Sequence, residues 1–239
     1  VRQLERTIAT ICRKTVLAIL KDKKKSIRVS KKLIREWLGN EKVEYGKREK
    51  KDQIGTVTGL AYTSFGGDVL QIEVNKFEGK GKLVLTGQLG DVMKESCQAA
   101  VTYIRSRTSE LGIDPAFHKN TDIHLHFPEG AVPKDGPSAG AAICLCVVSA
   151  LTNRPVRADI AMPGEITLRG RVLPIGGIQE KTMAALRAGI HEVLLPEDNV
   201  SDLAEMDPNV RNAVNFTAVS HMDQVLKKAR RPAEEKVAE

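Results

Sequence analysis

The most informative segment of the chain is PEGAVPKDGPSAGAAICLCVVSAL, residues 128–151. A loop rich in Gly and Pro is followed there by a helix that is apolar on every side. Because no side of such a helix can face water favourably, we expect it inside a core. The loop delivers Ser138 to the N-terminus of this helix, where free backbone N–H groups and the positive end of the helix dipole can stabilise an oxyanion. Ser138 is therefore either a nucleophile or simply the N-cap of the helix, the commoner role of a serine there.

Short strands and helices alternate on both sides of this segment. Helical periodicity marks residues 91–111, 138–151 and 178–188. Strand-like runs occupy residues 54–60, 69–74, 82–86, 122–127, 159–162 and 192–195. With 41% apolar and 28% charged residues, the composition is that of an ordinary globular protein that can bury a core. We therefore predict a mixed α/β (α+β) domain over residues 54–239.

A second transition from loop to helix supplies a candidate base. It reads LPIGGIQEKTMAALRAGI, residues 173–190, and places Lys181 on the same helix face as Ile178, Ala184, Ala185 and Ala188. Burial disfavours the charged form of lysine, so its pKa should fall below the free value of about 10.4. A lysine with a lowered pKa can act as a general base near neutral pH. The alternative is a lysine that extends from the helix end into water.

The first 53 residues differ from the rest of the chain in charge. They hold 17 Lys and Arg against 7 Asp and Glu, whereas residues 54–239 hold 20 against 23. Apolar residues at helical spacing between Leu4 and Leu20 predict a first helix, and we expect Ser30 and Gly39 to begin and end a second one. The polar run EKVEYGKREKKDQ reads as a linker, so we place the domain boundary near residue 53.

Several classes of protein are excluded by the sequence. No apolar run approaches the length of about 20 residues that a membrane span needs, and no secretory signal is present. The 4 cysteines form no C-x-x-C pair and lie in apolar helical surroundings, which fits a reducing compartment. The close pair His124 and His126 has no Cys neighbour, so we predict no metal site. The chain has no P-loop, and its GKGK at residues 79–82 reads as a turn.

Several longer motifs together resemble one known family. They are VTGLAYTSFGGD, GKGKLVLTGQLGDVMKES, DIHLHFPEGAVPKDGPSAG, GEITLRGRVLPIGGIQEK and HMDQVL. This pattern resembles the proteolytic domain of bacterial Lon, an ATP-dependent serine protease, and the resemblance covers nearly the whole chain. It implies a Lon-type Ser–Lys dyad in which Ser138 is the nucleophile and Lys181 is the general base.

The resemblance also implies a setting for this domain. The opening VRQLERTIATICRK is similar to the end of the family's small helical ATPase subdomain, with Arg2 at the position of a nucleotide-sensing arginine. Because the chain begins at Val1 and not at Met, we expect it to be a fragment. We therefore expect no metal or cofactor within it, and ATP with Mg at a site outside it. The implied partners are unfolded or damaged proteins and identical subunits of a homohexamer, in the cytoplasm.

Two departures from the family pattern concern the expected site. Pro163, in MPGEI, stands where most members have Thr, whose hydroxyl is expected to hydrogen-bond the lysine of the dyad. The orientation of Lys181 then depends on the Ser138 hydroxyl, a backbone carbonyl or water. Tyr62 stands where Trp is common, in a strand expected to line the substrate groove.

Asp135 has two possible roles. The resemblance makes it a candidate conformational switch, because in some members this carboxylate contacts the lysine and holds an inactive arrangement. Such a contact would raise the pKa of Lys181 and oppose the effect of burial. The alternative is a turn-forming Asp before Gly136. The other candidates are Gly136 and Pro137 as neighbours of the active site, and Glu129 and Gly130 in the substrate groove.

Two other functions remain open at this point. Residues 136–140 also satisfy G-x-S-x-G, the motif of hydrolases that use a histidine base, and His191 and His221 are available. The basic first segment also allows an inactive assembly module or a nucleic-acid-binding module. With only 4% aromatic residues, recognition of single-stranded nucleic acid has little support. A charged helix face that packs against an ATPase domain is the simpler explanation.

Overall fold

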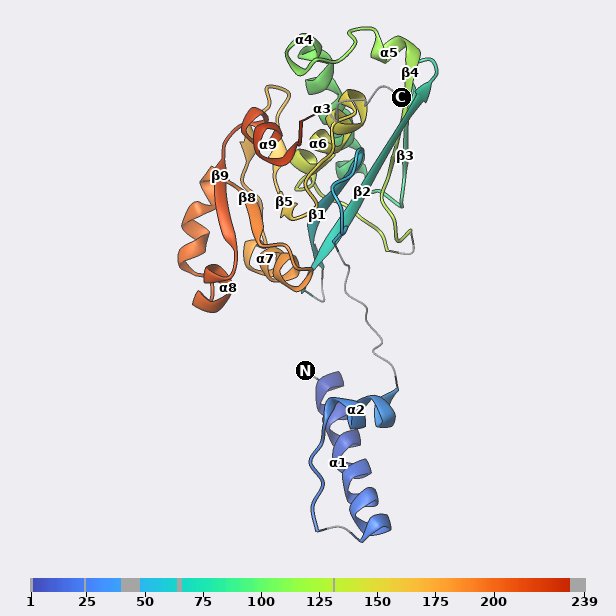
Figure 1. Ribbon diagram of the computed structural model, residues 1–239, viewed down its shortest axis with the longest axis vertical. Helices are drawn as coiled ribbons and strands as arrows, with labels where there is room; N and C mark the ends of the chain where they lie inside the picture. The colour runs from blue at the N-terminus through green and yellow to red at the C-terminus, as the bar shows by residue number, and fades with distance from the viewer. Residues whose placement is uncertain (1, 24, 40–47, 64–65, 131, 233–239) are drawn as a thin grey trace, which may run out of the picture. The chain divides into compact units, whose positions relative to one another are not determined.

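The computed structural model describes residues 2–23, 25–39, 48–63, 66–130 and 132–232, which form two compact units (Figure 1). The first unit, Val1–Glu44, contains α1 (Arg2–Asp22) and α2 (Lys31–Leu38). As predicted, the Ser30 side chain accepts a hydrogen bond from the Leu33 N–H, and Gly39 ends the helix. The ammonium group of Lys14 on α1 donates to the Trp37 carbonyl on α2. None of the described helices is long and apolar enough to cross a bilayer.

The second unit, Tyr45–Glu239, is built around a four-stranded sheet with the strand order β1-β2-β4-β3. Its strands are β1 (Thr56–Thr63), β2 (Gly66–Glu78), β3 (Leu83–Thr86) and β4 (Thr121–His126). β1, β2 and β4 pair antiparallel, whereas β3 runs parallel to β4. β1 therefore lies at one edge of this sheet, which matters for the site described below.

The apolar helix of the decisive segment is α6 (Gly140–Thr152), and it lies in the centre of the second unit. All residues from Gly140 to Ala150 are buried, as the sequence predicts. α6 packs against β1 and β2 of the sheet, against α3 (Asp91–Ser106) and against α9 (Met222–Ala229) (Figure 1). Cys97, Cys144 and Cys146 lie in this core, whereas Cys12 lies on α1 and is exposed.

A second, smaller sheet is formed by the C-terminal part of the chain. Its strands are β5 (Ile160–Ala161), β8 (Glu192–Pro196) and β9 (Asn215–Val219), all parallel. β6 (Glu165–Ile166) and β7 (Val172–Leu173) pair antiparallel and form a separate two-stranded sheet. The helices here are α7 (Ile178–Arg187), the 3₁₀ helix η1 (Glu197–Ala204) and α8 (Pro208–Asn212).

The predicted mixed fold is confirmed, with differences in individual elements. The helix expected over residues 91–111 is divided into α3 and α4 (Thr108–Leu111), because Arg107 leaves the helical conformation. β6 and β7 are too short for a periodic pattern and were not predicted, nor were β9, α5 (Phe117–Asn120), α8 and α9. These elements are short, and periodicity alone does not identify short segments.

The boundary between the two compact units lies at residues 44 and 45, earlier than the expected boundary near residue 53. Residues just before 53 join the second unit through hydrogen bonds. Asp52 accepts from the Ala158 N–H and from the Arg231 side chain, and Gln53 exchanges backbone hydrogen bonds with Val156. Asp52 and Gln53, at the end of the polar run that we read as a linker, are therefore bound to the surface of the second unit.

Candidate active site

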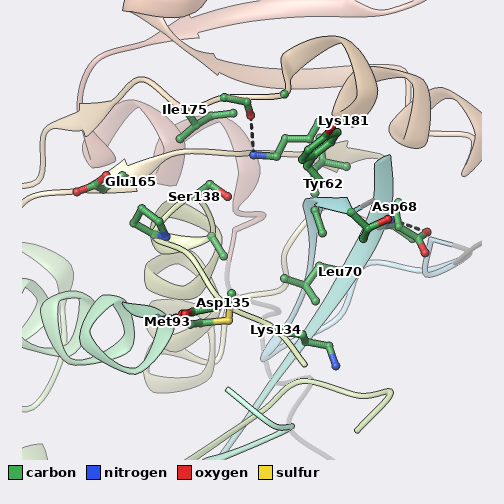
Figure 2. A pocket seen from close by; sticks show the side chains of 18 of the residues that line it. Tyr62, Asp68, Leu70, Met93, Lys134, Asp135, Ser138, Glu165, Ile175 and Lys181 are labelled. Atoms are coloured by element: carbon green, nitrogen blue, oxygen red, sulfur yellow. Dashed lines mark hydrogen bonds between the residues drawn. The ribbon is translucent and has the colours of Figure 1, made fainter. Parts of the chain in front are cut away.

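A pocket of about 600 Å³ opens between the β1–β2 hairpin, the loop before α6 and the loop before α7 (Figure 2). Six residues singled out from the sequence line it: Tyr62, Glu129, Asp135, Pro137, Ser138 and Lys181. Three others, Gly130, Gly136 and Pro163, are not among its lining residues. Pro163 is buried and directly precedes Gly164, whose N–H donates to the Ser138 carbonyl.

Ser138 lies two residues before α6 begins, and its position is fixed by the backbone. Its carbonyl accepts from the Gly164 N–H at 2.8 Å, and the Ala141 N–H donates to the Gly164 carbonyl at 2.9 Å. The N-cap of α6 is Ala139, and no side chain caps the helix. The simple N-cap interpretation of Ser138 is therefore wrong. Its hydroxyl has no hydrogen-bond partner among the described residues, and its side chain points into the pocket (Figure 2).

Two backbone donors beside Ser138 are suited to hold a negative charge. Within the described residues, the N–H groups of Ser138 and Ala139 have no hydrogen-bond acceptor. They precede the first turn of α6, whose dipole adds positive potential at this end. Free N–H groups with this orientation can stabilise an oxyanion that forms next to the serine.

Lys181 lies in the first turn of α7 and is almost completely buried, with 4% of its surface exposed. This confirms the helix-face prediction and rules out a lysine that extends into water. Its Nζ donates to the Gly176 carbonyl at 3.0 Å. A backbone carbonyl, one of the three partners expected in the absence of a Thr hydroxyl at position 163, therefore orients Lys181. Burial lowers the pKa of Lys181 to about 8, and the Glu180 carboxylate opposes this shift. Figure 2 shows Lys181, from α7, and Ser138, from the loop before α6, entering the same pocket.

Asp135 contacts α3 and not Lys181. One oxygen of its carboxylate, Oδ1, accepts from the Met93 N–H at 3.0 Å and from the Gly136 N–H at 2.9 Å. It thereby caps α3, whose own N-cap residue, Gly90, has no side chain. Asp135 thus stabilises the turn before Gly136 and caps α3. Its role as a conformational switch stays a prediction.

The walls of the pocket come from six separate segments, and several of their residues were not predicted from the sequence. Tyr62, at the end of β1, is 60% exposed and forms part of the rim. The missed lining residues include Asp68 and Leu70 on β2, Met93 on α3, Lys134 in the loop, Glu165 on β6 and Ile175 before α7. No local pattern identifies them, because each becomes part of the site only through the packing of distant segments. All of them except Leu70 lie within the motifs quoted above, but those motifs do not single them out as pocket residues.

The histidines of the chain lie away from this pocket. His221 caps α9, and its Nε2 interacts with the Arg169 carbonyl, whereas His191 contacts the Ala213 carbonyl. Neither lines the pocket that contains Ser138, so the structure does not support a G-x-S-x-G hydrolase with a histidine base. His124 and His126 both contact the Thr86 hydroxyl. Over the described ranges, no group of three or more His, Cys, Asp or Glu side chains is placed to hold a metal ion.

Comparison with protein families matches residues 28–231 to the Lon protease (S16) C-terminal proteolytic domain. The chain belongs to the Lon protease family. Residues 1–27, which include the first unit's helix α1, match the Lon protease AAA+ ATPase lid domain. The resemblance found in the motifs is thereby confirmed, and with it membership of a family of serine peptidases.

Individual relatives agree with this assignment. The chain is 56% identical over 229 residues to the Lon protease of Brevibacillus choshinensis, and 54% identical over 229 residues to Lon protease 1 of Bacillus subtilis. Both alignments cover 96% of this chain but only 29% and 30% of the relatives. The chain therefore spans about a third of the length of the curated relatives that it matches.

Proposed function

We propose that this chain is the peptidase part of a longer ATP-dependent protease, and that it cleaves peptide bonds with Ser138 as nucleophile and Lys181 as general base. The observation that carries the proposal is the burial of Lys181 in the pocket that Ser138 enters. At pH 7.5, a pKa of about 8 leaves roughly a quarter of this lysine neutral, against about one part in a thousand for a free lysine. A usable base is therefore present at neutral pH.

The proposed reaction has two stages. Neutral Lys181 takes the proton from Ser138 Oγ as this oxygen attacks the carbonyl carbon, and the N–H groups of Ser138 and Ala139 hold the oxyanion. The C–N bond then breaks, and Lys181 gives its proton to the leaving amine, which leaves an acyl ester on Ser138. In the second stage water attacks the ester, Lys181 takes a proton from that water, and the proton returns to Ser138 Oγ as the acid is released.

The position of β1 favours an extended polypeptide as substrate. β1 is an edge strand of its sheet, and its residues 60–63 border the pocket. An extended peptide can pair with a free strand edge and present one carbonyl to a fixed nucleophile. Folded proteins do not offer such a segment, so we propose unfolded or damaged proteins as substrates.

The partners of the whole protein form a further part of the proposal. The match of residues 1–27 to an ATPase lid supports binding of ATP and Mg by the remainder of the longer protein. The proposed dyad itself uses no metal or cofactor, because both proton transfers take place between Ser138, Lys181, substrate and water. We also propose a homohexamer in the cytoplasm as the state in which the family's protein works.

Covalent labelling tests the nucleophile. We expect a fluorophosphonate probe to modify Ser138, as seen by peptide mapping of the labelled chain. Ser138→Ala should lose this label, while Ser109→Ala, which removes an exposed serine outside the pocket, should keep it. In Lys181→Met the labelling rate should fall by at least about 100-fold, the usual contribution of a general base. Labelling that persists unchanged in Ser138→Ala would contradict the assignment.

Substitution of Asp135 separates its capping role from its switch role. Asp135→Ala leaves two backbone N–H groups without their acceptor, so we expect it to lower the free energy of unfolding by about 1–2 kcal/mol. Asp135→Asn keeps an oxygen acceptor and should cost less. Because Asp135 does not contact Lys181, Asp135→Asn should leave the midpoint of the activity–pH profile unchanged. A midpoint that moves to lower pH in Asp135→Asn would show that the two groups meet in the working enzyme.

A further inference from the structure

The helix that carries Lys181 rests on a glycine of the β1–β2 hairpin. Gly67 is the second residue of β2 and pairs with Tyr62 of β1. A Cβ atom built on Gly67 would lie 1.9 Å from the Glu180 carbonyl oxygen and 3.0 Å from the Lys181 nitrogen. Real Cβ atoms essentially never approach other heavy atoms within 3.0 Å, and here the atoms are rigid backbone of α7. Only glycine therefore allows β2 to touch the first turn of α7.

Two further contacts join the same hairpin to α7. The guanidinium group of Arg187, in the last turn of α7, donates to the Gly67 carbonyl. At the other end of the helix, a Cβ on its N-cap residue Gly177 would lie 3.3 Å from the Tyr62 ring, so the two residues are in close contact. Both the first and the last turn of α7 are thus held by residues of one hairpin.

We propose that Gly67 is a positioning residue for Lys181, because its bare backbone seats the first turn of α7 and keeps Nζ inside the pocket beside Ser138. The inference rests on the proposed function of Lys181 as the base. Gly67 itself lies outside the lining of the pocket, so it acts through α7 and not by touching substrate. In the sequence it belongs to Gly66-Gly67-Asp68, which looks like an ordinary turn.

A displaced α7 has a specific consequence for Lys181. A side chain on Gly67 pushes the first turn away from β2, which admits water to Nζ and weakens the effect of burial on its pKa. Glu180 moves with the helix, whereas the other charged residues of the pocket stay in place. These are Asp68, Glu129, Lys134, Asp135 and Glu165. α7 also packs against η1 and α8, whose charged residues do not line the pocket. The pKa of Lys181 should therefore rise toward its ordinary value.

The pH profile of short-peptide cleavage by the full chain tests this inference. In Gly67→Ala we expect the midpoint of the acid limb to rise by at least about one pH unit and the rate at pH 7 to fall by about tenfold or more, since activity follows the neutral lysine. The matched control is Gly59→Ala on β1 of the same hairpin. Its Cβ would lie 3.4 Å from the Leu70 carbonyl oxygen, an ordinary contact, so midpoint and rate should match the parent.

A second variant decides the case if Gly67→Ala does not fold. Arg187→Met removes the donor to the Gly67 carbonyl without adding an atom at the contact. It should move the midpoint in the same direction by a smaller amount. A folded Gly67→Ala, or failing that Arg187→Met, that keeps the midpoint of the parent overturns the inference, whether or not its rate falls. Activity retained in Ser138→Ala or Lys181→Met would instead overturn the proposed function, so the two failures are distinguishable.

Discussion

Ser138→Ala and Lys181→Met are each expected to reduce peptide hydrolysis by a factor of about 10³ or more, because each removes one half of a unit that transfers a single proton. The double variant should be hardly slower than either single one, since the two groups act only together. Steady-state cleavage of a fluorogenic peptide measures this effect. Circular dichroism of each variant shows whether the fold is intact.

Lys76→Met provides a matched control for the lysine. Lys76 also donates to a backbone carbonyl, that of Leu151, at 3.1 Å, and desolvation lowers its pKa as well. It lies outside the pocket that contains Ser138. We therefore expect Lys76→Met to keep the parent's activity within about twofold, as is usual for a change away from the site. Equal losses in Lys76→Met and Lys181→Met would show that the loss is a general effect of replacing a lysine and not the removal of a base.

Activity should rise with pH and level off above a midpoint of about 8, because only neutral Lys181 can accept the proton of Ser138. Below the midpoint, each lower pH unit reduces the neutral fraction, and with it kcat/KM, by about tenfold. Measuring kcat/KM between pH 5.5 and 9.5 tests this expectation. A flat profile across pH 7–9 would exclude Lys181 as the titrating base.

The same pKa shift predicts how stability changes with pH. Since the folded protein holds Lys181 with a pKa of about 8 and the unfolded chain near 10.5, the unfolded state binds more protons between these values. This lysine therefore costs the fold about 3 kcal/mol below pH 8, and the cost disappears as pH rises to 10.5. Lys181→Met should thus be more stable than the parent at pH 7, with a difference that shrinks above pH 8 in urea titrations.

The local order of residues was enough to predict the two main elements of the site. The unbroken apolar run of α6 indicated a central helix, and the loop before it identified Ser138. The helical spacing of Lys181 with small apolar residues predicted its burial, which the structure confirms. Both predictions succeeded because they depend on the side chains of one short segment, and a periodicity of 3.6 residues converts spacing directly into a helix face.

The tertiary structure alone decided the contacts that orient these two residues. The spacing of Ser138 and the helix start could not distinguish a nucleophile from an N-cap; the structure places Ala139 and not Ser138 at the N-cap of α6, and the nucleophile role stays a prediction. The carbonyl of Gly176 and the contact between Gly67 and α7 are likewise absent from any pattern. The physical reason is that backbone N–H and C=O groups are nearly the same in every residue, so the sequence does not indicate which of them will form hydrogen bonds with each other. Only the packing of distant segments determines where these groups lie.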